Sequence, residues 1–207
     1  MWSLMVAAWA ARLEPSMVPA EVVPYRTEDG WINDLRHYPG EGPPVLLVHG
    51  MGANHYNFDF RPEVSLAAYL QAAGWDVWVP ELRGDPGSEA PPGVDVAAIS
   101  FDDLAWRDLP AAVDRVLEET GEEALYWVGH SMGGILLYTA LSRYPEKVRA
   151  GVAIASPVSL RSPLKIYRLA RGAAFLTHGK GVLPLRGLGR LAVDLGMAGA
   201  LEKRVST

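Results

Sequence analysis

Short apolar runs alternate with segments of helical periodicity along most of the chain. Residues 45–48 are four consecutive apolar residues, which predicts a strand buried on both faces. Further strands are expected at residues 76–79, 125–128 and 148–155. Before them, residues 21–27 and 31–38 resemble two strands joined by a tight turn at residues 28–30, and these would form an antiparallel edge.

Strands and helices in this order predict a doubly wound, mostly parallel α/β sheet with an antiparallel N-terminal edge. Helices are expected at residues 64–73, at residues 110–119 and from Ile135 onward. Asp108 is predicted to be the N-cap of the second helix, with Pro110 in its first turn. The carboxylates of this region then have helix-terminal or surface roles rather than a catalytic one; they are Asp102, Asp103, Asp108 and Asp114.

The pattern changes after Pro157. Residues 159–207 are basic, rich in leucine and interrupted by glycines, with nine Lys or Arg against Asp194 and Glu202, whereas the whole chain has a net charge of −5. We therefore expect residues 1–158 to form the core and residues 159–207 to form a helical cap that exchanges amide hydrogens fastest. A solvated surface explains the charge asymmetry, and affinity for anionic lipid is the alternative.

Composition limits the chemistry that the chain can perform. About half of the 207 residues are apolar, enough for one substantial core, and cysteine is absent, so a cysteine nucleophile is excluded. No stretch reaches about 18 uninterrupted apolar residues, and residues 1–11 lack the basic start of a secretion signal. We expect a cytoplasmic protein, with peripheral contact to a lipid surface as a further option and no nucleic-acid partner; the oligomeric state is not indicated.

The most informative stretch contains Ser131 between Gly129 and Gly133. Apolar residues 125–128 predict a strand before it, and Ile135 begins a helical pattern after it. A serine in such a sharp strand-to-helix turn needs neighbours without side chains, and its hydroxyl is presented as a nucleophile. Met132 N–H, at the start of the helix, is then the first donor to an oxyanion. The alternative is a glycine-rich turn in which the serine only caps the helix.

A second glycine-rich loop, residues 49–52, follows the first buried strand. Strand ends of this kind meet at one edge of an open α/β sheet, so we expect Gly50 and Met51 to lie near Ser131, with Met51 N–H as the second oxyanion donor. His49 is predicted to be structural, with its ring tied to the loop backbone. Arg83, in the loop after the next strand, is predicted to brace that loop through a carboxylate.

These motifs together resemble the α/β-hydrolase superfamily, over about residues 22–157. The resemblance rests on His49-Gly50-Met51-Gly52, on Leu82-Arg83-Gly84 and on Gly129-His130-Ser131-Met132-Gly133-Gly134. Residues 56–63 and 75–79 are similar to lipase-like members, and also to polyhydroxyalkanoate synthases, whose elbow cysteine is absent here. The family's haloalkane and epoxide hydrolysing members place aspartate at the elbow, so Ser131 implies a serine esterase or lipase acting on an apolar acyl ester.

The resemblance also implies a catalytic acid followed by a histidine after the nucleophile. After Ser131 the order is reversed, because His178 precedes Asp194 and Glu202. We therefore expect residues 1–207 to be an amino-terminal fragment, almost inactive by itself, of a hydrolase whose acid and base lie beyond Thr207. The alternatives are a non-catalytic protein that binds an apolar ligand and an acyltransferase of the same fold. No cofactor and no metal are expected.

Overall fold

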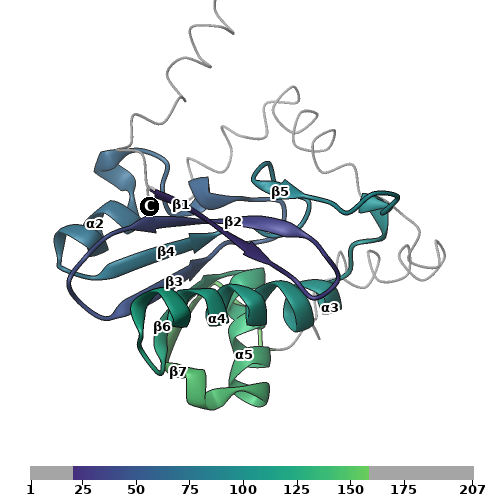
Figure 1. Cartoon of the computed structure of the whole chain (residues 1–207). Coiled ribbons are helices and arrows are strands. Elements are labelled where there is room, and N and C mark those ends of the chain that lie inside the picture. The colour runs from purple at the N-terminus through teal and green to yellow at the C-terminus, as the bar shows by residue number, and fades with distance from the viewer. Residues whose placement is uncertain (1–20, 159–207) are drawn as a thin grey trace, which may run out of the picture. The chain divides into compact units, whose positions relative to one another are not determined.

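The computed structural model of the protein describes residues 21–158, and its centre is a seven-stranded sheet (Figure 1). Along the sheet the strand order is β1-β2-β4-β3-β6-β7, and β5 pairs with β2 outside that path. The strands are β1 (Glu21–Arg26), β2 (Ile32–Tyr38), β3 (Pro44–Val48), β4 (Asp76–Pro80), β5 (Ser88–Glu89), β6 (Leu125–His130) and β7 (Val148–Ile154).

The sheet is parallel from β4 to β7 and antiparallel at its N-terminal edge. Strands β1 and β2 form a hairpin, β2 also runs antiparallel to β4, and β3 pairs in parallel with both β4 and β6. The predicted fold class is therefore confirmed, and only the short strand β5 was not expected. Because β3, β4 and β6 are parallel neighbours, the loops that follow them emerge at the same edge of the sheet.

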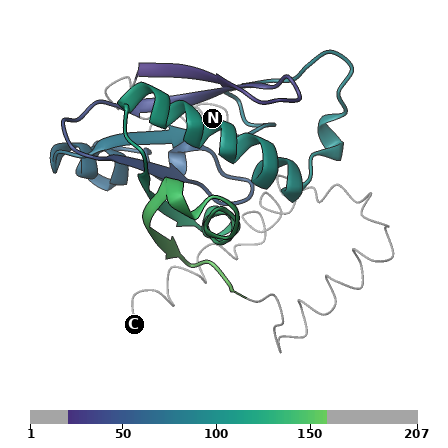
Figure 2. The same ribbon diagram turned by 60° about the horizontal axis from the view of Figure 1, so that its bottom comes forward.

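Two apolar clusters lie on the two faces of the sheet. Leu46 and Val48 of β3 belong to the cluster that includes residues of α4 (Leu109–Thr120) and α5 (Met132–Arg143), whereas Val45 and Leu47 face the cluster that includes Ala67 of α2 (Leu66–Ala72). Figures 1 and 2 show α4 and α5 on the same side of the sheet. Every residue of β3 is buried, as expected for a strand covered on both faces.

Several short helical turns complete the described part of the chain. They are η1 (His55–Asn57), η2 (Pro62–Val64), η3 (Val96–Ala98), α3 (Phe101–Asp103), η4 (Leu104–Asp108) and η5 (Pro145–Lys147). Strand β7, by contrast, pairs only with β6 among the described residues, and Val152 and Ile154 on it are exposed. No helix within residues 21–158 has the length and apolarity that a membrane crossing requires. The predicted cap, residues 159–207, lies outside the described residues.

The predicted N-cap role of Asp108 is wrong. Residues 101–120 form one continuous helical segment in which Asp108 has helical backbone angles and caps nothing. Pro110 has no N–H to donate to the carbonyl four residues earlier. The turn before it widens into a π-helix, η4, in which the N–H of Leu109 donates to the carbonyl of Leu104. Asp108 is fully buried rather than on the surface, and it pairs with Arg83.

Candidate active site

Ser131 occupies the turn between β6 and α5 in a strained conformation. Its φ of 50° and ψ of −111° lie outside the regions that residues with a Cβ favour, and such outliers cost about 1–3 kcal/mol each. The backbone holds the strain in place: Ser131 N–H donates to the carbonyl of Ile154 over 2.9 Å, and the Ser131 carbonyl accepts from Gly134 and Ile135. The surrounding sheet therefore fixes this serine in a conformation that it would not adopt alone.

Glycines allow the turn because backbone lies against them. A Cβ on Gly129 would lie 2.3 Å from the carbonyl oxygen of Gly133, and a Cβ on Gly133 would lie 2.0 Å from that of Val48. This is the collision with the adjacent strand and helix that the motif predicted. Each glycine thus permits a close approach that places β3, β6 and the start of α5 side by side.

The variant Gly133→Ala is expected to lower the free energy of unfolding by about 3 kcal/mol, because the added methyl group meets backbone that cannot rotate away. Gly121→Ala is the control. Gly121, unlike Gly133, has a positive φ, of 70°, and it has open space around it, so the cost of Gly121→Ala should be limited to about 1 kcal/mol of backbone strain. Urea unfolding of both variants of the complete protein measures the difference, and equal losses would contradict the steric explanation.

The loop after β3 packs directly against the elbow. A Cβ on Gly50 would come within 3.1 Å of His130 Nδ1 and 3.3 Å of the Ser131 Cβ. The side chain of Asn57 joins the two segments, because its Oδ1 accepts from the N–H of Gly50 over 3.2 Å and from Nδ1 of His130 over 3.0 Å. Asn57 was not singled out from the sequence, since nothing local marks it as the link between two loops far apart in the chain.

A cavity of about 250 Å³ adjoins the elbow. Met51 and Met132, whose N–H groups are the predicted oxyanion donors, both contribute to its wall, as do His49, Arg83 and Asp85. Most of the other wall residues are apolar, and they include Leu82, Ile99, Phe101 and Leu104. Met51 is 69% exposed whereas Met132 is buried. The cavity can therefore take a mainly apolar group beside Met132, the residue that follows the predicted nucleophile in the chain.

No side chain within residues 21–158 hydrogen-bonds the hydroxyl of Ser131. The four histidines of this part are all engaged elsewhere: His37 contacts Asp76, His49 contacts Asp85, His55 contacts Glu81, and His130 contacts Asn57. The remaining histidine, His178, lies outside the described residues. The part of the chain that the structure describes thus supplies a serine and its surroundings but no general base for it.

A buried polar cluster lies behind the loop of residues 49–52. His49, Glu81 and Asp85 bring ligand-type atoms within 4.8 Å of one another, a spacing that a metal ion could bridge. These groups already have polar partners, since Asp85 contacts His49 while His55 and Arg36 contact Glu81. We therefore assign the cluster as a set of mutually paired side chains rather than as a metal centre. His49 itself lies with Nδ1 3.0 Å from the Gly50 carbonyl.

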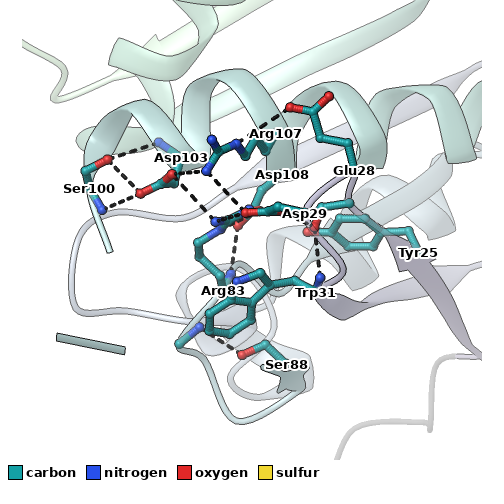
Figure 3. A network of polar contacts seen from close by, with 12 residues as sticks. Tyr25, Glu28, Asp29, Trp31, Arg83, Ser88, Ser100, Asp103, Arg107 and Asp108 are labelled. Carbon is teal, nitrogen blue, oxygen red and sulfur yellow. Dashed lines mark hydrogen bonds and ion pairs between the residues drawn. The ribbon is translucent and has the colours of Figure 1, made fainter. Parts of the chain in front are cut away.

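Arg83 is the centre of a larger network, drawn in Figure 3. Its backbone N–H and its Nε both donate to Asp108, over 2.9 and 2.7 Å, and its two terminal nitrogens donate to Asp29. The guanidinium also lies over the ring of Trp31, 5.3 Å from the ring centre. The bracing role predicted for Arg83 is confirmed. Burial raises the pKa of Asp29, but the hydrogen bonds from Arg83 and Thr27 outweigh it and lower the pKa to about 2.

Comparison with known proteins decides the family. A family model described as alpha/beta hydrolase fold matches residues 43–179, which include the loop of residues 49–52 and the elbow. This chain belongs to the α/β-hydrolase family. Gastric triacylglycerol lipase of Rattus norvegicus is 35% identical over 160 residues, which cover 67% of this chain and 40% of that protein. Lysosomal acid lipase/cholesteryl ester hydrolase of Homo sapiens is 36% identical over 143 residues, 62% of this chain and 36% of that protein.

Solved structures agree on the fold. An epoxide hydrolase from Vigna radiata aligns with a TM-score of 0.56 and 28% identity, covering 72% of this α/β-hydrolase chain and 42% of that one. Epoxide Hydrolase A from Mycobacterium thermoresistibile aligns with a TM-score of 0.55 and 25% identity, covering 75% and 45%. The chain spans about 40% of the length of the first curated relatives that it matches.

Proposed function

We propose that the complete protein is a serine hydrolase of carboxylic esters that forms an acyl-enzyme at Ser131. The observation that carries the proposal is the strained serine at the apex of the strand-to-helix turn, held against Gly50. A protein that only binds a ligand would gain nothing from this strain, whereas a nucleophile needs its hydroxyl presented at the strand edge. The similarity to proteins named as lipases supports the same reaction class.

In the proposed mechanism the Ser131 hydroxyl attacks the ester carbonyl, and the N–H groups of Met51 and Met132 stabilise the oxyanion that forms. A histidine from outside the described residues accepts the serine proton and returns it to the leaving alcohol. A carboxylate, also from outside them, orients that histidine. Water then releases the acid from the acyl-enzyme by the same steps. Transfer of the acyl group to another alcohol would use the same intermediate.

The proposed substrate is an ester with an apolar acyl chain. The mostly apolar wall of the cavity beside Met51 and Met132 favours such a group over a charged metabolite. The similar solved structures are epoxide hydrolases, but a serine at the elbow favours acyl transfer over epoxide opening. When a serine hydroxyl attacks an ester substrate, the acyl-enzyme that forms is itself an ester, which water can cleave. Residence in the cytoplasm with contact to a lipid surface remains part of the proposal.

A series of p-nitrophenyl esters graded by acyl length tests the substrate class on the complete protein. We expect kcat/KM to rise about 10-fold or more from acetate to a medium-length chain, since each buried methylene is worth about 0.8 kcal/mol. A preference for acetate would overturn the apolar-substrate proposal. Binding of a fatty acid without turnover of any ester would favour the non-catalytic alternative.

A further inference from the structure

The peptide group between Gly50 and Met51 is held from its carbonyl end. The Gly50 carbonyl oxygen accepts a hydrogen bond from Nδ1 of His49 over 3.0 Å and another from the N–H of Ala53 over 3.2 Å. A trans peptide is planar, so its carbonyl and its N–H point in opposite directions. Fixing the Gly50 carbonyl therefore fixes the direction of Met51 N–H, the donor to the oxyanion in the proposed function.

The ring of His49 has oxygen atoms at both nitrogens. Nδ1 must carry a proton, because the carbonyl can only accept. Nε2 lies 2.9 Å from Oδ2 of Asp85, an ionic contact rather than an aligned hydrogen bond, and it has no hydrogen-bond partner within residues 21–158. The ring is 2% exposed, so water does not compete for either nitrogen. A carboxylate at Nε2 and a carbonyl at Nδ1 are both best satisfied by the doubly protonated, positively charged ring.

Asp85 is itself held in place. Its Oδ2 accepts from the N–H of Leu82 over 2.8 Å, and its own N–H donates to the carbonyl of Leu82 over 3.0 Å. The next residue, Arg83, anchors this loop to Asp108. The carboxylate that faces His49 is thus fixed by the loop after β4, and the ion pair joins that loop to the loop after β3.

The charges around His49 favour the same protonation state. Glu81 places a second carboxylate near the ring, and it is contacted in turn by His55 and Arg36. Burial lowers the pKa of His49, but the contact with Asp85, the Gly50 carbonyl and the charge of Glu81 outweigh it, so the pKa lies above its usual value. Arg83, which lines the same cavity, is engaged with Asp108 and Asp29.

We propose that the His49–Asp85 ion pair is a positioning device that aims and polarises the Met51 N–H for the oxyanion. The positive ring withdraws electron density through the Gly50 carbonyl, and hydrogen bonds in such a chain strengthen one another. His49 and Asp85 touch no substrate atom and act through the peptide. The inference rests on the proposed function, because it assigns these two residues to the oxyanion donor of that reaction.

Asp85→Asn in the complete protein separates charge from shape. An asparagine can still accept from Leu82 N–H, but the charge that holds the His49 ring protonated is lost. We expect kcat for a p-nitrophenyl ester to fall about 10-fold with KM changed less than about 3-fold, a fraction of the 10²–10³-fold loss of a whole donor. On the alkaline side of the pH profile, the activity of Asp85→Asn should also begin to decline at a lower pH than that of the wild type. Asp59→Asn, another buried aspartate, which contacts Ser65, is the matched control and should retain kcat.

A second variant and a spectroscopic readout complete the test. His49→Phe should lower kcat about 100-fold while its melting temperature reports whether it folds. In ¹⁵N-labelled protein, the Met51 amide proton should move upfield in Asp85→Asn and stay unchanged in Asp59→Asn. An unchanged Met51 amide shift together with an unchanged kcat in Asp85→Asn would overturn the inference. The proposed function would still stand in that case if Ser131→Ala loses activity. Activity that survives in Ser131→Ala would overturn the proposed function, and the Met51 amide then decides the effect of the ion pair on the peptide.

Discussion

Ser131→Ala is expected to remove covalent labelling of the complete protein by a serine-directed phosphonate and to lower kcat for a preferred ester about 10⁶-fold. The reason is chemical, because alanine has no oxygen with which to form the acyl-enzyme. A residual rate of about 10³-fold or more above the uncatalysed reaction should remain, since the oxyanion donors and the cavity are left in place. Mass spectrometry of the labelled protein and single-turnover kinetics measure the two quantities.

Ser142→Ala is the matched control for this experiment. Ser142 lies on the same helix, α5, but is exposed, so its replacement should leave labelling and turnover unchanged. Equal labelling of the Ser131→Ala variant and the wild type would show that another residue is the nucleophile. Labelling that is absent from the wild type, with a folded protein, would favour the ligand-binding alternative over the hydrolase.

The elements that could be predicted from the sequence are those specified by local pattern. Four consecutive apolar residues at 45–48 required burial on both faces, and the structure places β3 in the middle of the sheet. The turn at Ser131 was predictable because two glycines flanked a residue between a strand and a helix, and the steric reason for them is backbone contact. Patterns of this kind depend only on near neighbours in the chain.

The predictions failed where a distant partner overrides the local signal. An aspartate two residues before a proline is typical of a helix start, yet the helical segment already begins at the capping box of Ser100 and Asp103. The Asp108 carboxylate accepts two hydrogen bonds from Arg83 in another loop instead of capping the helix. Asn57 and Asp85 were missed for the same reason, since their partners are His130 and His49. The predicted oxyanion donors and the predicted cap remain predictions, the latter outside the described residues.

The fold of this chain and the reaction proposed for it depend on different residues, and the reaction depends on the residue at the apex of the elbow, Ser131. The similar solved structures are epoxide hydrolases, whereas the similar sequences are named as lipases. A shared fold hosts different reactions, so the fold alone does not choose between them. In the proposed function the residue at the apex makes that choice, and here it is a serine. This is why the Ser131→Ala experiment tests the reaction class rather than the family.

Asp108→Ala is expected to lower the free energy of unfolding by about 3–5 kcal/mol, the usual cost of leaving one half of a buried ion pair without its partner. Asp108 is fully buried and the Arg83 side chain is 3% exposed, so water cannot replace the lost carboxylate. Asp29 remains as a partner at the other end of the guanidinium, which limits the loss. Urea unfolding of the complete protein, followed by tryptophan fluorescence, measures the change.

The exposed pair of Lys147 and Asp114 provides the control, because Asp114→Ala should cost less than about 1 kcal/mol.

Acid should act on the network around Arg83. The pKa of Asp29 is about 2 in the folded protein against an ordinary 3.8, so its contribution is present above pH 4 and is lost as the pH falls towards 2. An Asp108→Ala variant no less stable than Asp114→Ala would contradict the role assigned to Arg83. Because Arg83 anchors the loop that carries Asp85, Asp108→Ala should also lower kcat for the preferred ester, by a route that passes through His49 and the Gly50 carbonyl rather than through any contact with the substrate.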